Sequence, residues 1–184
     1  MKKGDIVVAT ARNPEVLDDL KTQYPATQLI TVKLDVTKVG DIGNAFVKAK
    51  EAFGRVDVVF NNAGWSPVAE IEAHPEGEAR KMFDTNFWGS TNVSREAVRF
   101  FREENVPSGG LLLVNSSMSG IRSVPIMGYY SASKHGTLAF ESYSMVAHAL
   151  AAVEGVTQAL SMELDPSWNI KVSRGTFRQP YTTS

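Results

Sequence analysis

A tyrosine and a lysine stand four residues apart in the segment YYSASKHGTLAF, as Tyr130 and Lys134. Residues with this separation lie on the same face of a helix. A lysine ammonium close to a tyrosine hydroxyl favours the phenolate by direct attraction, so the pair could exchange a proton with a substrate oxygen. A Y-x-x-x-K spacing also arises by chance, and the pair needs support from other motifs.

Two further polar segments follow apolar runs of the chain. The segment NNAG follows VDVVF, and NSS follows GGLLLV. The amides of an NNAG turn can hold neighbouring loops, and its two small residues let a flat ligand approach the backbone. An ordinary Asx turn is the structural alternative. The residues in question are Asn61, Asn62, Ala63 and Gly64 in the first segment and Asn115, Ser116 and Ser117 in the second.

The elements that would position these residues alternate along the chain as apolar runs and helical patterns. This alternation predicts an α/β fold with a doubly wound parallel sheet, whose ligands bind at the carboxyl ends of the strands. Asn13 and Pro14 predict the start of one helix, and Gly54 predicts the end of another. The predicted strands are 5–10, 28–36, 56–60, 109–115 and 169–172, and the predicted helices are 14–20, 42–53, 70–104 and 130–164.

Composition limits the class of protein. With 184 residues, 43% of them hydrophobic and 21% charged, the chain is expected to form a single soluble domain over 1–184. The 19 Lys and Arg nearly balance the 20 Asp and Glu, which favours a small-molecule partner over nucleic acid or an acidic membrane surface. The absence of cysteine and the spacing of the three histidines argue against a metal site. No signal peptide or bilayer-spanning stretch is evident, so we expect a cytoplasmic protein.

Four motifs together resemble the short-chain dehydrogenases/reductases: NNAG at 61–64, Asn86 in FDTNFWGS, Ser117 in VNSSMSG, and Tyr130 with Lys134 in YSASK. They occur in the order and spacing of that family, and the resemblance covers about residues 3–172. It implies a Rossmann-like NAD(P)-binding domain that transfers hydride between a nicotinamide cofactor and an alcohol or carbonyl substrate. It is also compatible with a homo-oligomer.

The resemblance assigns a role to each catalytic position. Tyr130 is the general acid/base, and Lys134 both favours its phenolate and binds the nicotinamide ribose. Ser117 donates a hydrogen bond to the substrate oxygen; no His or Asp stands in register to make it a hydrolase nucleophile. Asn86 holds a water near the lysine, although a lone helix asparagine is more often structural.

The cofactor residues are assigned in the same way. NNAG at 61–64, Tyr130 and Lys134 would be cofactor-binding residues, with Lys134 at the nicotinamide ribose. Asp35 would meet the adenine ring or, alternatively, act as a helix N-cap. Arg12 stands where relatives that prefer NAD carry an acidic residue. Because an arginine attracts a 2′-phosphate, we expect NADP(H) to be preferred over NAD(H); Arg12 as a solvated strand end is the alternative.

The sequence departs from the family pattern at both ends. It begins at the family's second strand and contains no Gly-rich pyrophosphate turn. The missing strand would lie between DIVVAT and VDVVF, so we expect two exposed strand edges there. After NIKV the Pro-Gly turn and the substrate segment are also missing. Trp65, Pro67, Val68 and the loop 122–127 could still line one wall of an apolar pocket.

A third departure lies inside the predicted catalytic helix. Lys171 follows Lys134 by 37 residues, which is more than the family spacing and marks 136–151 as an insertion. A helical extension and translated non-coding sequence are the two explanations. We favour the second, because the segment lacks turn residues that would lead the chain out and back.

Two functions are compatible with this sequence. The first is an NADP(H)-dependent oxidoreductase, truncated at both ends, that interconverts a secondary alcohol and a ketone or aldehyde. The alternative is a catalytically inactive fragment or interaction module of the same fold. The four intact motifs favour the enzyme, whereas the missing glycine turn and the insertion favour the inactive module.

Overall fold

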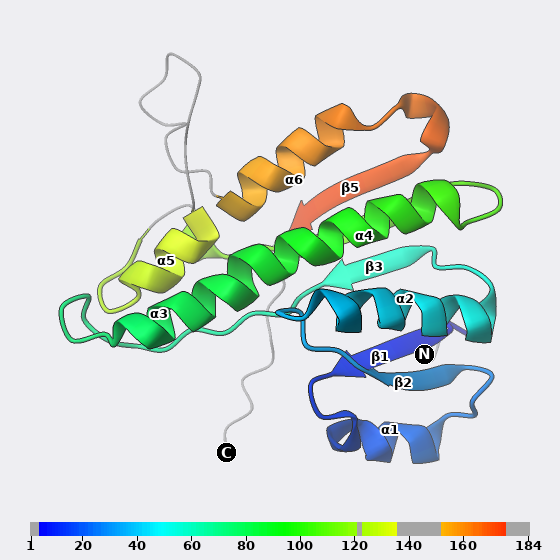
Figure 1. The fold of residues 1–184 in the computed structure, drawn as a ribbon, viewed down its shortest axis with the longest axis horizontal. Helices are drawn as coiled ribbons and strands as arrows, with labels where there is room; N and C mark the ends of the chain where they lie inside the picture. The colour runs from blue at the N-terminus through cyan, green and yellow to red at the C-terminus, as the bar shows by residue number, and fades with distance from the viewer. Residues whose placement is uncertain (1–3, 121–122, 136–151, 176–184) are drawn as a thin grey trace.

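The computed structural model describes residues 4–120, 123–135 and 152–175, in which helices and strands alternate (Figure 1). The strands are β1 (Val7–Ala11), β2 (Leu29–Lys33), β3 (Val58–Asn61), β4 (Gly110–Asn115) and β5 (Ile170–Gly175). The helices are α1 (Asp18–Gln23), α2 (Val39–Phe53), α3 (Glu76–Phe83), α4 (Ser90–Glu103), α5 (Gly128–His135) and α6 (Ala152–Glu163). Short turns of 3-10 helix occupy Pro14–Leu17, Met118–Gly120 and Pro166–Trp168, and a π-helical turn occupies Asp84–Gly89.

All strand pairs are parallel, which confirms the predicted α/β class. The strands form two sheets rather than one: β1 pairs with β2 from Val7↔Leu29 to Ala11↔Lys33, and the second sheet has the order β3-β4-β5. Within the described residues no ladder joins β1 to β3. Val58 and Phe60 on β3 are about half exposed, as the sequence predicted for this edge.

Helix α2 connects the two sheets through a shared core. Its buried side chains recur at helical spacing, and the ring of Phe46 lies 5.3 Å from that of Phe100 on α4. The helix ends at Gly54, whose φ of 79° is left-handed and whose N–H donates to the Lys50 carbonyl at 2.8 Å. The predicted glycine cap is therefore confirmed.

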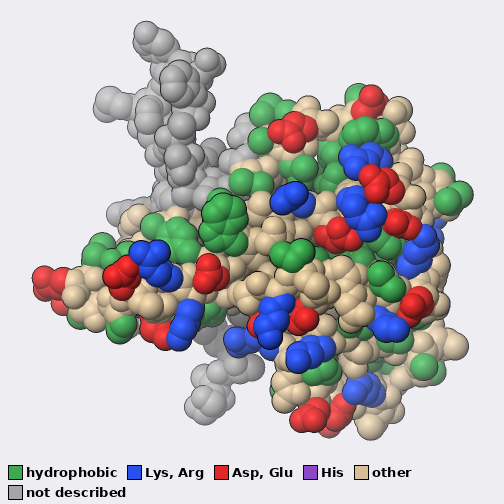
Figure 2. Space-filling view, viewed as in Figure 1, with side chains coloured by type: hydrophobic (Ala, Val, Ile, Leu, Met, Phe, Trp, Pro, Cys, Tyr) green, Lys and Arg blue, Asp and Glu red, His purple; other side chains and the backbone are tan. Residues whose placement is uncertain are grey.

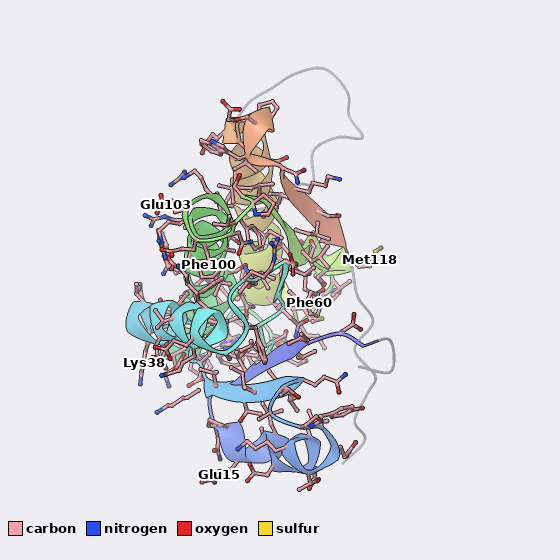
Figure 3. The ribbon with its side chains drawn as sticks, turned by 90° about the vertical axis from the view of Figure 1, so that its right-hand side faces the viewer. Glu15, Lys38, Phe60, Phe100, Glu103 and Met118 are labelled. Carbon is pink, nitrogen blue, oxygen red and sulfur yellow. The ribbon has the colours of Figure 1, made fainter. Side chains whose placement is uncertain are left out.

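Helix α4 provides most of the core of the three-stranded sheet. Its Phe101 is fully buried and belongs to one apolar cluster with Leu112 and Val114 of β4. Helices α4 and α6 cover the same face of this sheet (Figure 1), and Figure 3 shows Phe100 on that side and Met118 on the opposite side. The long helix predicted over 70–104 begins at Glu76 and is interrupted by the π-helical turn.

The predicted helix 130–164 is found in two pieces, α5 and α6. The predicted insertion, 136–151, lies outside the described residues. The last predicted strand is confirmed as β5, which pairs with β4 over six residues from Gly110↔Ile170 to Asn115↔Gly175. Segments far apart in the sequence thus meet at the carboxyl end of β4.

The outer face of α2 and α4 carries charges of both signs (Figure 2). Arg99 forms ion pairs with Glu96, Glu103 and Glu104, and Glu104 also pairs with Lys50. Such solvent-exposed pairs contribute little to stability, typically about 0–1 kcal/mol each. Among the helices that the structure describes, none combines the length and the apolar character needed to cross a membrane.

Candidate active site

Asn61, the last residue of β3, fastens the end of this strand to α4. Its buried Nδ2 donates to the Ser90 carbonyl at 2.7 Å and lies 3.1 Å from Ser90 Oγ and 3.0 Å from Ser94 Oγ. Buried amides need such partners because an unsatisfied donor costs about 1–3 kcal/mol. The first amide of the NNAG motif is therefore a structural tie that fixes where the turn begins.

Asn86 lies in the π-helical turn and is fully buried. Its Oδ1 accepts the Trp65 N–H at 3.0 Å, and its Nδ2 donates to the Trp65 carbonyl at 2.9 Å and to Ser133 Oγ at 3.0 Å. Ser133 Oγ in turn donates to the Tyr130 carbonyl at 2.8 Å. One side chain thus joins the loop after Gly64 to helix α5. π-Helical turns such as the one that carries Asn86 are frequent at functional sites.

Lys134 extends from α5 into the same region. Its side chain is buried, with the residue only 5% exposed, and its Nζ donates to the Asn115 carbonyl at 3.1 Å. The ammonium lies 6.0 Å from the centre of the Tyr130 ring. Burial lowers the pKa of Lys134 from its ordinary value, since desolvation disfavours the charged form.

Gly64 permits the close approach of the NNAG turn to this lysine. A Cβ at position 64 would lie 3.2 Å from Asn86 Oδ1 and 3.7 Å from Lys134 Nζ. Ala63 and Gly64 are themselves exposed, whereas Asn62 is half-buried. The turn therefore offers an open backbone surface directly beside the buried ammonium.

The carboxyl end of β4 brings Ser117 to the site. Asn115 Nδ2 donates to Asn62 Oδ1 at 2.7 Å, which links the ends of β4 and β3. Ser117 is half-buried, and its Oγ accepts the N–H of Ser119 at 3.1 Å. Because a hydroxyl has both an acceptor and a donor function, this bond leaves the Ser117 O–H able to donate to a ligand.

Arg12 and Asp35 follow β1 and β2 in the other sheet. These strand ends are adjacent, since the N–H of Leu34 donates to the Ala11 carbonyl at 2.9 Å. Asp35 Oδ1 accepts from Thr37 Oγ1 at 2.7 Å and from Thr37 N at 3.0 Å. These hydrogen bonds are the main cause that lowers the pKa of Asp35, and the charge of nearby Arg12 adds to the effect.

The structure thus brings the predicted site residues together in two groups. Asn86, Ser117, Tyr130, Lys134 and the NNAG turn surround the carboxyl ends of β3 and β4, while the exposed Arg12 and the half-buried Asp35 lie apart at the ends of β1 and β2. Sequence reasoning missed the roles of Ser133 and Asn115 as hydrogen-bonding partners. A signal for both existed: each is a short polar residue within three positions of a motif residue.

A phenol, a buried ammonium and a serine hydroxyl beside an open turn are groups that can polarise a carbonyl or an alcohol oxygen. Comparison with known proteins finds similar oxidoreductases. The family model described as short chain dehydrogenase matches residues 1–174. The chain is 35% identical over 173 residues to an uncharacterized oxidoreductase of Schizosaccharomyces pombe, covering 94% of this chain and 51% of that protein.

Solved structures give the same result. A short-chain dehydrogenase from Streptomyces avermitilis aligns with a TM-score of 0.77 and 32% identity over 96% of this chain and 58% of that chain. A 3-ketoacyl-(acyl-carrier-protein) reductase from Brucella melitensis, solved with NADH, shares the fold with a TM-score of 0.77 at 24% identity, over 94% of this chain and 65% of that one. The chain spans about half the length of the curated relatives it matches.

Proposed function

This chain belongs to the short-chain dehydrogenase family, a family of oxidoreductases, and from this premise we propose that it interconverts a secondary alcohol and a ketone or aldehyde with NADP(H). The observation that carries the proposal is the position of Lys134. Its buried ammonium lies 6.0 Å from the Tyr130 ring and next to the open NNAG turn. A phenol and a cation held close together can exchange a proton with a substrate oxygen and attract the charge that develops on it.

Tyr130 is the proposed general acid/base. In the reducing direction its hydroxyl gives a proton to the substrate oxygen, and in the oxidising direction the phenolate takes that proton back. Ser117 donates a hydrogen bond to the same oxygen and so stabilises the charge that develops on it. Lys134 holds its positive charge near both groups.

Asn86 and Ser133 are proposed to position Tyr130 and Lys134. Asn86 binds Ser133, and Ser133 binds the carbonyl of Tyr130. These contacts fix the first turn of α5 relative to the loop after Gly64. Small displacements of reacting groups reduce rates strongly, so this fixation matters for catalysis.

The residues present fit a nicotinamide dinucleotide. A Cβ at Gly64 would crowd Asn86 and Lys134, and Ala63 and Gly64 expose a backbone surface that a flat ring can approach. We assign Asn62, Ala63, Gly64, Tyr130 and Lys134 to the nicotinamide ribose side and Asp35 to the adenine. Asn61 supports this part of the cofactor site by fixing the start of the turn through its bonds to Ser90 and Ser94. When bound, the nicotinamide accepts or donates a hydride.

Arg12 supports NADP(H) over NAD(H). It is exposed at the end of β1 and close enough to Asp35 for its charge to act on that carboxylate. A guanidinium at this position can form a charge-assisted pair with a 2′-phosphate. The balanced net charge of −1 supports a small-molecule substrate rather than nucleic acid. The proposal keeps the cytoplasmic location and the homo-oligomer expected from the sequence.

The test is a Tyr130→Phe substitution, with Tyr129→Phe as the matched control on the neighbouring residue. We expect Tyr130→Phe to reduce carbonyl turnover with NADPH by about 10²–10⁴-fold, because general acid–base catalysis contributes that much. Nucleotide affinity is expected to stay nearly unchanged. Tyr129→Phe should keep most of the rate, since the ring of Tyr129 packs against His74 at 5.3 Å.

Retention of most of the rate in Tyr130→Phe would remove Tyr130 from the acid/base role. A chain that turns over none of a broad panel of ketones and alcohols, with either nucleotide, would contradict the proposed activity and favour an inactive module of this fold.

A further inference from the structure

Lys134 has different surroundings from the other lysines that the structure describes. Within 4–120, 123–135 and 152–175, seven other lysines are present and all are exposed: Lys21, Lys33, Lys38, Lys48, Lys50, Lys81 and Lys171. Four of these seven pair with a carboxylate. Lys134 is buried, and among the described residues no Asp or Glu forms an ion pair with it. Its amine is therefore buried without a described acid to offset a positive charge.

These surroundings favour the neutral form of the amine. A buried charge without a partner is costly, and such a group tends to neutralise itself by a change of protonation. Burial is the cause that lowers the pKa of Lys134 from its ordinary value. The lowered pKa increases the share of neutral amine, while the ammonium that the proposed proton transfer uses is still present. A desolvated neutral lysine is a nucleophile that forms Schiff bases with carbonyl compounds.

The amine of Lys134 is held in a defined position. Its Nζ donates to the Asn115 carbonyl at 3.1 Å, and the Asn115 side chain is itself bound to Asn62 at 2.7 Å. Because a carbonyl oxygen only accepts hydrogen bonds, an N–H of the amine points at Asn115 and the lone pair of the neutral form does not. The lone pair is therefore directed to another side of Nζ.

The absence of a side chain at Gly64 leaves room for one carbon atom beside this amine. A carbon placed there as a Cβ would lie 3.7 Å from Lys134 Nζ, and its closest neighbour would be Asn86 Oδ1 at 3.2 Å. Reacting atoms that are about 3–3.5 Å apart are close enough to form a bond. Ala63 and Gly64 are exposed, so a small molecule in solution can reach this turn.

The dimensions of this space limit the ligand to a small carbonyl compound. The distance of 3.2 Å to Asn86 Oδ1 is already short for one added carbon, so a branched group beside the reacting carbon would collide with Asn86. An aldehyde carbon bears only a hydrogen on one side, and its chain can extend towards the exposed side of the turn at Ala63. Small unbranched aldehydes, such as acetaldehyde, therefore fit this space best.

We propose that the nucleotide-free chain binds small aldehydes covalently, as an imine on Lys134, through the space beside Gly64. The Nζ lone pair attacks the carbonyl carbon and forms the C–N bond. Both protons of the neutral amine pass to the carbonyl oxygen, which leaves as water, and a C=N bond remains. Nothing is oxidised or reduced, and water reverses the reaction. This reaction is independent of hydride transfer and makes Lys134 a site of reversible modification.

The imine is trapped on the whole chain without nucleotide, with acetaldehyde and sodium cyanoborohydride at neutral pH, and each labelled lysine is located by peptide mass spectrometry. We expect Lys134 to be labelled at least about fivefold faster than Lys38 or Lys171, because a desolvated lysine is an activated nucleophile. The α-amino group, with an ordinary pKa of about 8, is labelled in any protein and is left out of the comparison. Labelling of Lys134 no faster than that of Lys171 would overturn the inference.

Two comparisons test the space beside Gly64. On the unmodified chain, the branched 2,2-dimethylpropanal should label Lys134 no faster than Lys171, because it does not fit. Gly64→Ala fills the space with a methyl group and should remove the preference of acetaldehyde for Lys134. Gly43→Ala is the matched control, since a Cβ there meets nothing within 4 Å; it should keep the preference. A preference for Lys134 that survives both the branched aldehyde and Gly64→Ala would overturn the assignment to this space.

Oxidised nucleotides separate this inference from the proposed function, because they cannot give a hydride to the aldehyde. Slower labelling of Lys134 with NADP⁺ or NAD⁺ would support both the imine and the nucleotide assignment at the NNAG turn. Fast labelling that neither nucleotide changes would support the imine and contradict that assignment. Turnover abolished by Tyr130→Phe, in a chain that shows no preferential labelling of Lys134, would support the proposed function and overturn the imine.

Discussion

The two sheets of this protein hold their proposed functional residues in different ways. At the carboxyl ends of β3 and β4, Asn61, Asn86 and Lys134 are buried and donate to protein groups. At the ends of β1 and β2, Arg12 and Asp35 are half-buried or exposed. A buried polar group must satisfy its hydrogen bonds inside the protein, whereas an exposed one can remain in water until a ligand arrives. Substitutions in the first group are therefore expected to change both ligand binding and protein stability, whereas substitutions in the second group should change ligand binding alone.

The supporting helices show the same contrast. Helix α1 and the 3-10 turn Pro14–Leu17, both within the described range 4–120, bury no residue. Helix α4 buries seven, from Ser90 to Phe101. The three-stranded region thus has its own core, and the two-stranded region depends on α2 for its connection to that core.

Replacing Asn86 with Ala tests the buried group at the carboxyl ends of β3 and β4, and it has the largest expected effect on stability. The substitution removes three hydrogen bonds and leaves the Trp65 N–H and carbonyl without this partner. We expect the free energy of unfolding to fall by about 2–4 kcal/mol, measured by urea denaturation. Asn13→Ala is the control, because the Asn13 side chain is exposed and makes one local bond to Glu15 N; it should cost about 1 kcal/mol. Equal losses would contradict the contrast between the two regions.

Replacing Arg12 with Ala tests the group at the ends of β1 and β2. Loss of a charge-assisted bond to a 2′-phosphate should weaken NADPH binding by about 1.5–3 kcal/mol and leave NADH binding nearly unchanged. Unfolding stability should stay within about 0.5 kcal/mol, as for other surface substitutions. Calorimetric titration with both nucleotides measures the first quantity. Arg12→Lys should keep part of the preference; a preference unaffected by Arg12→Ala would show that another residue selects the cofactor.

Replacing Gly64 with Ala should produce a smaller loss. Its new Cβ would lie 3.2 Å from Asn86 Oδ1 and compress the contacts around Lys134, which we expect to cost about 1 kcal/mol. Gly43→Ala is the matched control, because a Cβ there meets nothing within 4 Å on helix α2; it should stabilise by about 0.5–1 kcal/mol. Thermal unfolding of both variants gives the comparison, and a stabilising Gly64→Ala would contradict the close packing at this turn.

The smallest expected effect is a pH dependence from Lys134. Burial lowers the folded-state pKa of Lys134 below its ordinary value of 10.5. Between the folded and unfolded pKa values the unfolded state binds more protons, so stability rises with pH in that window. The cost of burying the ammonium is fully present below the folded pKa and is lost as pH approaches 10.5.

Lys134→Met removes this titration. The stability of the unmodified chain relative to the variant should therefore increase as pH rises above the folded-state pKa of Lys134 towards the ordinary lysine value. Urea unfolding of both proteins at several pH values measures the difference. A difference that stays constant, or that decreases with pH, would show that the Lys134 ammonium is not destabilised by burial.

The sequence predicted the features that depend on residues close together along the chain. The end of α2 at Gly54 follows from local chemistry, and the strands follow from their apolar runs. The shared face of Tyr130 and Lys134 follows from helix geometry. The division into two sheets was anticipated as exposed strand edges, because the family resemblance implied a missing strand between β1 and β3.

The remaining features depend on contacts across long stretches of chain. Asn115 reaches Asn62 across 53 residues, and Asn86 reaches Ser133 across 47. No periodicity marks such pairs. The sequence shows that each partner is a polar residue in or next to a motif, but it does not show which of these residues meet. The left-handed conformation of Ile126 was equally hidden, because isoleucine is one of the residues least expected there.

The π-helical turn at Asp84–Gly89 has a consequence for how this chain tolerates insertions and deletions. A π-helical turn contains more residues than an α-helical one, and each residue of an α-helix rotates the chain by about 100°. Deleting Thr85 should convert this turn to ordinary helix and leave α4 in its orientation relative to α3, because the wide turn holds one residue more than an α-helical turn. Only the residues inside the turn would move, and Asn86 would then turn away from Trp65. We expect this deletion to lower the melting temperature about as much as Asn86→Ala, with the helix content in far-UV circular dichroism retained, whereas deleting Glu72 from the exposed loop before α3 should change the melting temperature little. An alignment gap in this helix would thus change the geometry of the proposed active site and would not be a neutral difference in length.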